Sequence, residues 1–398
     1  MPSEHMDHGA MHHGGARTGV LGSYPMARDA SGTSWQPDAA SHSGLHTAAG
    51  GWDFMGHVNL GIVYDRQSGP RGDDKTFPTG MIMGAARRDI GSGTFNLRAM
   101  LSPEPFMGKR GYPLLLAAGE TADGATTLVD RQHPHDLLME LAGSYSLKLA
   151  DGVSAFLYGG DPAEPALGPP AFMHRPSSAE LPAPITHHWL DSTHIAFGAV
   201  TGGIVAGDVK LEASQFTGRE PDEKRFDFDR ARFDSTSARI TWNPGENWSF
   251  QVSAGRLNSP EGLTPNEDEK RWTASLMYVR PVGEDQMFAM TLAGGLKQHE
   301  HGDDLGGALA EASYRVGNFT FFGRAEWAEN HDLNPGTVEE IGAGSLGGIY
   351  DIPLAPHVKI GIGGVATRPF LDNATGAFEA SYGSNPHGEM AFIRLRLD

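Results

Sequence analysis

The 398-residue chain contains no cysteine, which excludes disulfide bonds and thiolate metal sites. It also lacks a long apolar run: the longest nearly uncharged stretch, residues 194–207, contains glycine and threonine and falls short of the ~20 residues that a membrane-spanning helix needs. Basic residues are too few for a nucleic-acid protein, because 31 Lys and Arg face 49 Asp and Glu and the formal charge is −18. Nucleic acid is therefore not an expected partner.

A signal peptide is also missing, since Met1–Gly15 is polar and rich in histidine rather than apolar. We therefore expect a mature chain whose export must be inferred from the rest of the sequence. One repeating pattern runs from Trp52 to Asp398 without a linker. It predicts one domain over residues 52–398, preceded by a flexible Met/His-rich tail over residues 1–51.

The repeating pattern consists of apolar-alternating segments joined by connections that are in turn tight and long. Tight connections such as Gly207 and Gly317 alternate with two connections of more than thirty residues, 102–135 and 161–191. The predicted strands are 52–66, 75–89, 93–101, 136–150, 153–160, 192–206, 208–218, 234–242, 247–257, 268–280, 284–298, 305–316, 318–329, 339–351, 356–367 and 387–398. This indicates an all-β, transmembrane, antiparallel up-and-down β-barrel of about sixteen strands, with short periplasmic turns and long extracellular or inward-folded loops.

Alternation within the strands assigns the two faces of the barrel wall. In 318–329, for example, Phe319, Phe321 and Trp327 point toward lipid, while Thr320 and Arg324 point inward. The charged residues predicted to line the pore in this way are Asp53, Arg98, Glu140, Lys210, Glu212, Arg239, Arg271, Glu311, Arg324, Glu326, Lys359, Arg394 and Arg396. Their mixed signs favour a hydrated lumen, and a barrel of this size encloses an aqueous channel unless a segment plugs it.

Methionine and histidine form a second inward pattern in the first strands. Met55, His57, Met81, Met83 and Met100 offer thioether and imidazole groups that suit Cu(I) or Ag(I). The alternative is that these methionines fill gaps in a lumen packed by a loop. The tail adds residues whose composition is typical of a metal-gathering segment, namely Met6, His8, Met11, His12 and His13.

The two long connections carry most of the remaining histidines. His133, His135 and Asp136 stand in the first, and His174, His187, His188 and His194 stand in or just after the second. If both loops fold over the same strand ends, these groups meet near the mouth and could hold a borderline divalent metal such as Cu(II), Ni(II) or Zn(II). Alternatively they bond to arginines and backbone groups and fix the loops as a plug, which is compatible with metal binding.

An enzyme is a third alternative, because some outer-membrane barrels modify lipids. Ser192 or Ser144, with His194 or His188 and Asp191, supplies the residue types of a nucleophile, a base and an orienting carboxylate. Adjacency in sequence does not establish their hydrogen-bonded geometry, so we predict no catalytic residues.

Several motifs support a resemblance to known barrels. The tail resembles the Met/His-rich N-terminal segments of outer-membrane copper-resistance barrels. The motifs His-Pro-His-Asp at 133–136, Phe-Met-His-Arg at 172–175 and His-His-Trp-Leu-Asp-Ser-Thr-His at 187–194, with residues 216–221 and 382–386, resemble an uncharacterised family of Gram-negative outer-membrane proteins often encountered in metal-resistance contexts. The resemblance implies an outer-membrane location but no established activity, and the ending Leu397–Asp398 departs from the aromatic terminus common in such barrels.

The sequence thus favours a porin-like outer-membrane channel for small hydrophilic solutes or ions, with His-rich constriction loops. Envelope handling of copper or another heavy metal is the alternative, and a lipid-modifying enzyme is the third hypothesis. We expect membrane lipid as a partner, no required cofactor apart from a possible copper ion, and a monomer or an oligomer.

Overall fold

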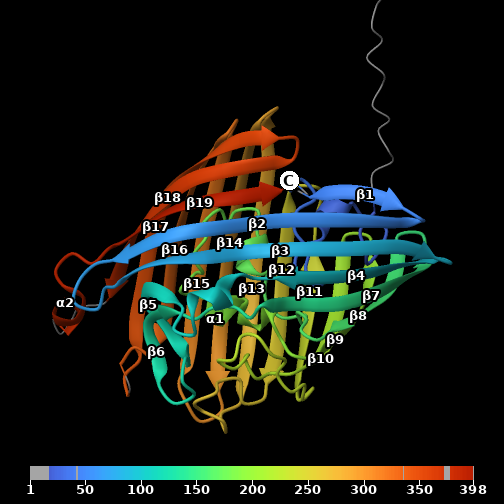
Figure 1. Cartoon of the computed structure of the whole chain (residues 1–398). Coiled ribbons are helices and arrows are strands. Elements are labelled where there is room, and N and C mark those ends of the chain that lie inside the picture. Colours follow the sequence, from blue (N-terminus) through green and yellow to red (C-terminus); the bar gives the residue numbers. More distant parts are fainter. Residues whose placement is uncertain (1–17, 42–43, 335, 372–376, 398) are drawn as a thin grey trace, which may run out of the picture.

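The structure, a computed structural model, describes residues 18–41, 44–334, 336–371 and 377–397. Sixteen antiparallel strands form a closed ring in chain order, and the last strand pairs with the first (Figure 1). The ring contains β2 (Trp52–Gln67), β3 (Asp74–Ile90), β4 (Gly93–Leu101), β7 (Leu138–Ala150), β8 (Val153–Gly160), β9 (Ala199–Ala206), β10 (Val209–Phe216), β11 (Ser235–Trp242), β12 (Trp248–Leu257), β13 (Glu269–Gly283), β14 (Gln286–His299), β15 (Asp304–Val316), β16 (Phe319–Asn330), β17 (Glu339–Ala355), β18 (Val358–Leu371) and β19 (Gly388–Leu397). This architecture confirms the predicted barrel. No helix among the described residues is long and apolar enough to cross a bilayer.

The connections alternate as predicted. Gly207 and Gly317 adopt positive φ values of 58° and 56° in turns too tight for most residues, and both turns lie at the rim that also holds the other short connections. The opposite rim carries the long connections, including the short helix α2 (Ala377–Tyr382) between β18 and β19. One rim of the barrel therefore consists of tight turns and the other of long connections.

The outer face of the wall is apolar and has an aromatic band near the short-turn rim. Phe319 and Phe321 are exposed, as expected for side chains that contact lipid. Trp248 packs on Tyr278 with ring centroids 4.4 Å apart, and Trp242 stacks on Phe250 at 5.6 Å. Such rings are typical of the aromatic girdle at a membrane interface.

The connection between β8 and β9 runs inside the barrel. It contains η3 (Phe172–His174), α1 (His187–Leu190) and η4 (Ser192–His194), and α1 lies within the ring of strands (Figure 1). The prediction that a strand begins at residue 192 is wrong for residues 192–198. The chain there still lies in the lumen, where Ala163 and Ala196 exchange backbone hydrogen bonds, and β9 starts only at Ala199.

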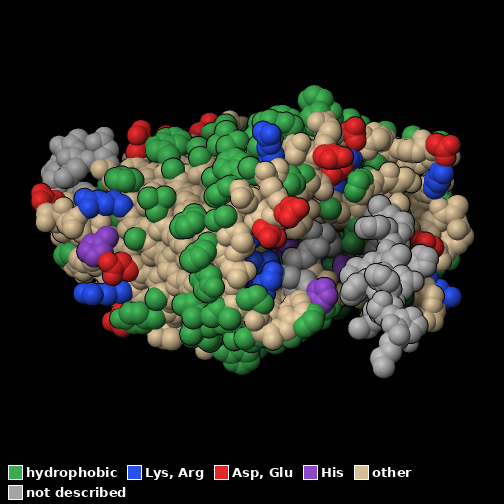
Figure 2. All heavy atoms as spheres, turned by 90° about the horizontal axis from the view of Figure 1, so that it is seen from above, with side chains coloured by type: hydrophobic (Ala, Val, Ile, Leu, Met, Phe, Trp, Pro, Cys, Tyr) green, Lys and Arg blue, Asp and Glu red, His purple; other side chains and the backbone are tan. Residues whose placement is uncertain are grey.

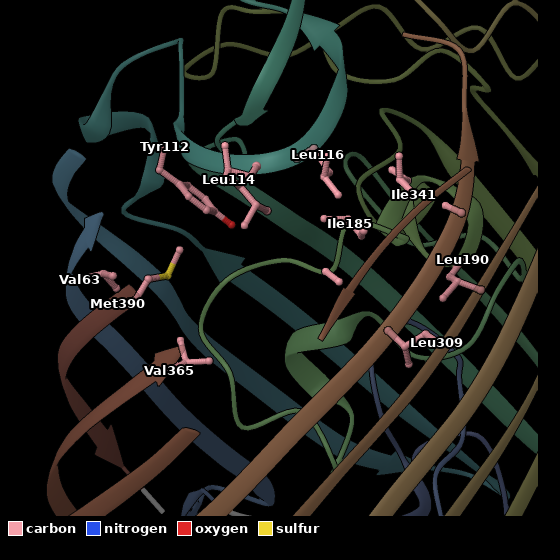
Figure 3. Packing of buried hydrophobic residues seen from close by; sticks show 14 of the residues in the cluster. Val63, Tyr112, Leu114, Leu116, Ile185, Leu190, Leu309, Ile341, Val365 and Met390 are labelled. Atoms are coloured by element: carbon pink, nitrogen blue, oxygen red, sulfur yellow. The ribbon is translucent and has the colours of Figure 1, made fainter. Parts of the chain in front are cut away.

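The connection between β4 and β7 also folds inward and forms elements that the sequence pattern did not predict. These are η2 (Glu104–Met107) and a hairpin of β5 (Tyr112–Thr121) with β6 (Thr127–Gln132). Figure 3 shows apolar side chains of β5 facing those of α1, of its preceding loop and of the wall, namely Tyr112, Leu114, Leu116, Ile185, Leu190, Val63, Leu309, Ile341, Val365 and Met390. An apolar core therefore occupies part of the long-loop half of the lumen.

The segment before the first barrel strand corrects the predicted domain boundary. Residues 18–41, which we call the N-terminal insert, lie in the short-turn half of the lumen, with η1 (Met26–Arg28) beside the turn at Asp208. Trp35 of this insert is 1% exposed. The strand β1 (Leu45–Ala49) then pairs with the start of β2 beyond the end of β19. The expected flexible tail over residues 1–51 is thus wrong for the insert, which is held by buried contacts with the wall, and for β1, whose residues are exposed but pair with β2.

Candidate functional site

A cavity of about 260 Å³ is left in the lumen on the short-turn side. It is bounded by β2, β3, β4 and β19, by the N-terminal insert, and by residues 173–179 of the inward loop. Asp53, Arg87, Arg315 and Arg396 line it and stand near the short-turn ends of their strands, so the cavity faces that rim. Figure 2, the view from above, shows a hollow bordered by basic, acidic and histidine side chains.

Arginine dominates the charged lining of this cavity. The lining includes six arginines, Arg87, Arg98, Arg175, Arg315, Arg394 and Arg396, against the two aspartates Asp29 and Asp53. Several are paired with carboxylates outside the lining: Arg98 lies 2.6 Å from Glu140, and Arg394 lies 3.1 Å from Asp351. The cavity therefore has a polar, guanidinium-rich wall although the chain as a whole is acidic.

The predicted methionine pattern falls partly on this cavity. Met55, His57, Met81 and Met83 line it, together with Met173 and His174 of the inward loop. Met100 instead lies in an adjoining apolar cluster with Met81, Met139, Ile195 and Phe197. The structure thus brings soft ligand groups together and also supports the alternative that methionine fills space beside the loop. The tail residues Met6, His8, Met11, His12 and His13 lie outside the described residues.

Most of the charged residues predicted to line a pore point inward but are covered. Asp53, Arg98, Arg394 and Arg396 reach the cavity. The inserted segments bury most of the others, namely Glu140, Lys210, Glu212, Arg239, Arg271, Glu311 and Arg324, while Glu326 and Lys359 are partly buried. The expected hydrated lumen is therefore wrong for these positions: Arg175 of the loop bonds Glu311, and Thr33 of the insert bonds Glu212.

The two inward loops bring five of the predicted histidines into one buried group. His135 and His194 have ring centroids 5.1 Å apart, and His187 and His194 are 5.2 Å apart. His188 lies 5.6 Å from both His187 and His133 by the same measure. His174 is not part of this group, because it faces the cavity on the other side of the loop.

Oxygen atoms hold one nitrogen of each histidine in the central triad. His135 Nδ1 donates to the Glu104 carboxylate at 2.9 Å, His187 Nδ1 to the Asp191 carboxylate at 2.8 Å, and His194 Nδ1 to the Asp191 carbonyl oxygen at 2.8 Å. The Nε2 atoms of His135 and His194 are buried and have no hydrogen-bond partner among the described residues. The triad therefore presents to a small void imidazole nitrogens that bond to no other described residue.

Burial and the neighbouring charges together set the charge state of this group. Burial opposes protonation of His135, but the adjacent Glu104 carboxylate outweighs it and raises the pKa of His135. Burial lowers the pKa of His187 and His194, which favours neutral imidazoles there. Burial opposes ionisation of Asp191, but Arg175, His187 and His194 together outweigh it and lower the pKa of that carboxyl to about 2. Burial likewise disfavours protonated His188, yet Glu220 outweighs it and raises the pKa of His188 to about 9.

Acidic partners of these histidines were missed by the sequence analysis. The Glu104 carboxylate accepts the hydrogen bond from His135 Nδ1. The Glu120 carboxylate lies 3.0 Å from His133 and 2.6 Å from Arg225. Asp136, a predicted metal ligand, instead pairs with Arg225 at 3.2 Å. The only sequence signal for Glu104 is a carboxylate placed between Pro103 and Pro105, which does not reveal a partner thirty residues away.

The serine, histidine and aspartate residues considered as a catalytic triad do not form the hydrogen-bonded chain that a triad requires. Ser192 Oγ accepts a hydrogen bond from Arg271 at 2.8 Å, and Asp191 bonds His187 and Arg175. Ser144 Oγ has no hydrogen-bond partner among the described residues. The geometry therefore offers no serine activated by a histidine at these positions.

No family model matches the chain, and no curated protein matches it. Solved structures match most of its length. OmpT of Vibrio cholerae is 8% identical with a TM-score of 0.51, covering 88% of this chain and 100% of that chain. The anion-selective porin from Comamonas acidovorans is 12% identical with a TM-score of 0.50, covering 87% of this chain and 99% of that one. A trimer form of OmpT, 9% identical, also has a TM-score of 0.50 and covers 87% and 99% of the two chains. These likenesses show a shared fold, that of Gram-negative outer-membrane barrels.

Proposed function

We propose that this protein is an outer-membrane channel for small hydrophilic solutes or ions, and that the described structure is its closed state. The observation that carries the proposal is the closed ring of sixteen strands around a charged cavity, with the rest of the lumen occupied by chain segments rather than by wall. In a large barrel whose lumen is plugged by chain segments, solute passes only when a segment moves.

The inserted segments supply the barrier in this proposal. The N-terminal insert contacts the wall through polar bonds such as Arg28 to Asp208 at 3.1 Å, and the loop contacts it through Arg175 and Glu311 at 2.7 Å. Polar contacts exchange for water at less cost than apolar ones, so the cavity side is the easier part to open. The apolar core around Tyr112 and Leu190 forms the tighter part of the barrier.

Ion current through single refolded barrels in a planar bilayer tests the proposal. We expect the full chain to pass little current. A variant without residues 18–41, 103–135 and 163–196, with short Gly-Ser linkers in place of the two loop segments, is expected to pass steady current, because these deletions remove the N-terminal insert and the apolar core of both inward loops. Circular dichroism and heat-dependent gel mobility check that both chains form barrels. A folded deletion variant that conducts no more than the full chain would contradict the proposal.

Handling of a soft metal ion is a second candidate function, favoured by the shared placement of Met55, His57, Met81, Met83 and Met173 on the cavity. Thioethers and imidazoles prefer Cu(I) over hard cations. Competition with a chromogenic Cu(I) chelator tests it: we expect Met81→Leu with Met83→Leu to weaken Cu(I) binding at least tenfold, and the lipid-facing exchange Leu346→Met to leave it unchanged. Equal affinity of the wild type and the double variant would contradict this function.

The neighbour solved as a trimer leads us to extend the channel proposal to a homo-oligomer. Chemical cross-linking in native outer membranes tests it, and a single monomer band would contradict it.

A further inference from the structure

The triad of His135, His187 and His194 is the strongest unassigned cluster in the described part of the chain. One potential ligand atom from each residue lies within 4.8 Å of the others, and all three side chains are buried. His135 comes from the loop between β4 and β7, while His187 and His194 come from the loop between β8 and β9. The triad is therefore a junction between two separate inward loops.

The hydrogen bonds of the triad match those of metal-ligating histidines. Such histidines donate the second ring nitrogen to a carboxylate or a backbone carbonyl, which fixes the tautomer and aims the free nitrogen at the ion. All three Nδ1 atoms are used in this way, with Glu104, the Asp191 carboxylate and the Asp191 carbonyl as acceptors. Two of the remaining Nε2 atoms are buried without partners, an arrangement that costs free energy unless something binds there.

The space beside the triad fits one ion. A small void of about 10 Å³ is lined by the three histidines together with Glu120, His133, Asp136, Ser192 and Arg225. That volume is about one water-sized sphere. The positive charge of Arg225 is offset by its bonds to Glu120 and Asp136 at 2.6 and 3.2 Å, so it does not exclude a cation from the void.

We infer that His135, His187 and His194 bind one zinc-type divalent transition-metal ion that ties the two inward loops together. Three imidazole nitrogens suit Zn(II), Co(II) or Cu(II), whereas Ca²⁺ and Mg²⁺ are bound mainly through oxygen ligands. The fourth position stays open to water. The site does not depend on the channel proposal, because a barrel that passes no current still binds metal here.

Cobalt(II) is the probe for this site, because its visible absorption reports tetrahedral nitrogen ligands. The chelator-treated full chain is titrated with Co(II) in detergent beside His135→Ala and His194→Ala. The matched control is His174→Ala, which removes a partly buried histidine of the loop between β8 and β9 that faces the other cavity. The Met/His residues of the tail are common to all four chains, so differences among them report the triad.

We expect the wild type and His174→Ala to bind one more equivalent of Co(II) than His135→Ala and His194→Ala, with a tetrahedral spectrum, and Zn(II) to displace it. Equal binding by all four chains, an equal loss in the control, or no binding by the wild type overturns the inference. If the two alanine variants do not form barrels, Glu104→Gln decides, because it keeps all three imidazoles. A roughly 10–100-fold weaker affinity supports the site, and an unchanged affinity overturns it.

Discussion

Thr33 Oγ1 donates a hydrogen bond of 2.5 Å to the Glu212 carboxylate, and so joins the N-terminal insert to β10 of the barrel wall. The same hydroxyl accepts from Arg239 at 3.0 Å, and Lys210 donates to the Thr33 carbonyl oxygen. One residue of the insert thus supplies hydrogen bonds to three charged wall residues that could face water in an open lumen.

The first prediction concerns this contact. Thr33→Val removes a hydrogen bond to a charged group and is expected to raise the amide hydrogen-exchange rates of residues 28–36 about ten- to a hundredfold. Thr33→Ser keeps the hydroxyl and is expected to exchange like the wild type. Exchange measured by mass spectrometry on the barrel in detergent checks both, and an insert equally protected in Thr33→Val would show that this contact does not hold it.

Arg324 supports the second prediction, because it fixes the inward loop from β16. Its guanidinium lies 3.0 Å from Glu180 of the loop and 2.9 Å from Glu326, and all three side chains are largely buried. Arg324→Met leaves two carboxylates without their cation, at a cost of about 3–5 kcal/mol. We expect faster proteolysis of residues 176–186 in folded barrels.

The triple variant Arg324→Met, Glu180→Gln, Glu326→Gln is the control for that experiment. It removes the cation together with both charges, so most of the lost stability is expected to return. If the single and the triple variant are cleaved at the same rate, the ion pairs do not hold the loop.

The barrel wall could be predicted from the sequence because the alternation of apolar and polar residues within each strand indicates both the strand and the orientation of its side chains. Alternation in residues 318–329 places Phe319 and Phe321 outward and Arg324 inward, and the structure agrees. Gly207 and Gly317 mark turns through their own backbone freedom. Local patterns therefore sufficed for the tight turns and for the wall strands apart from the start of β9, but not for the β5–β6 hairpin inside the barrel.

The contents of the lumen could not be predicted because they depend on partners far apart in the chain. Thr33 and Glu212 are separated by 179 positions and Arg28 and Asp208 by 180, and no local pattern links them. Inward-facing apolar residues such as Val63 and Phe322 were the available sequence signal that the lumen is filled, because apolar side chains are unfavourable in contact with water. The run Leu114–Ala118 was another, because such a loop must be buried.

The candidate metal site could be predicted only in part, less well than the barrel wall and better than the contacts in the lumen. The motif at 133–136 and the residues 187–194 contain the three histidines of the proposed site, but only the fold separates the triad from His174 and turns Asp136 toward Arg225. Residue types suggested metal binding, and tertiary contacts determine which histidines lie together.

The third prediction is that docking of the insert depends on pH through Glu164. Burial raises the pKa of this loop carboxyl to about 7, against the opposing effect of Arg239 and Arg98, while Glu140 adds to the increase. Because the folded pKa exceeds the unfolded value, the stabilisation is complete below about pH 4.5 and is lost as the pH rises through about 7, by up to about 3 kcal/mol. A Cβ on Gly32 would lie 2.7 Å from Glu164 Cβ, so the insert packs directly on this side chain.

Proteolysis of residues 18–41 at pH 5.5 and 8.5 measures this dependence, with a protease whose rate on an unfolded peptide is known at both values. We expect faster cleavage at the higher pH in the wild type and no such difference in Glu164→Gln, which stays neutral. A pH effect of the same size in both chains would assign it to another group.

The last prediction tests the lipid face of the barrel. Val252 near the middle of β12 and Leu354 near the short-turn end of β17 are both 59% exposed, so they differ in depth rather than in exposure. Because an arginine at the bilayer midplane loses its hydration, Val252→Arg is expected to lower the free energy of unfolding by about 2–4 kcal/mol, and Leu354→Arg by about 0–1 kcal/mol. Urea unfolding in lipid vesicles, followed by tryptophan fluorescence, measures both values. Equal losses for the two variants would mean that the two positions do not lie at different depths in a membrane. The exposed apolar face of the barrel would then contact something other than lipid.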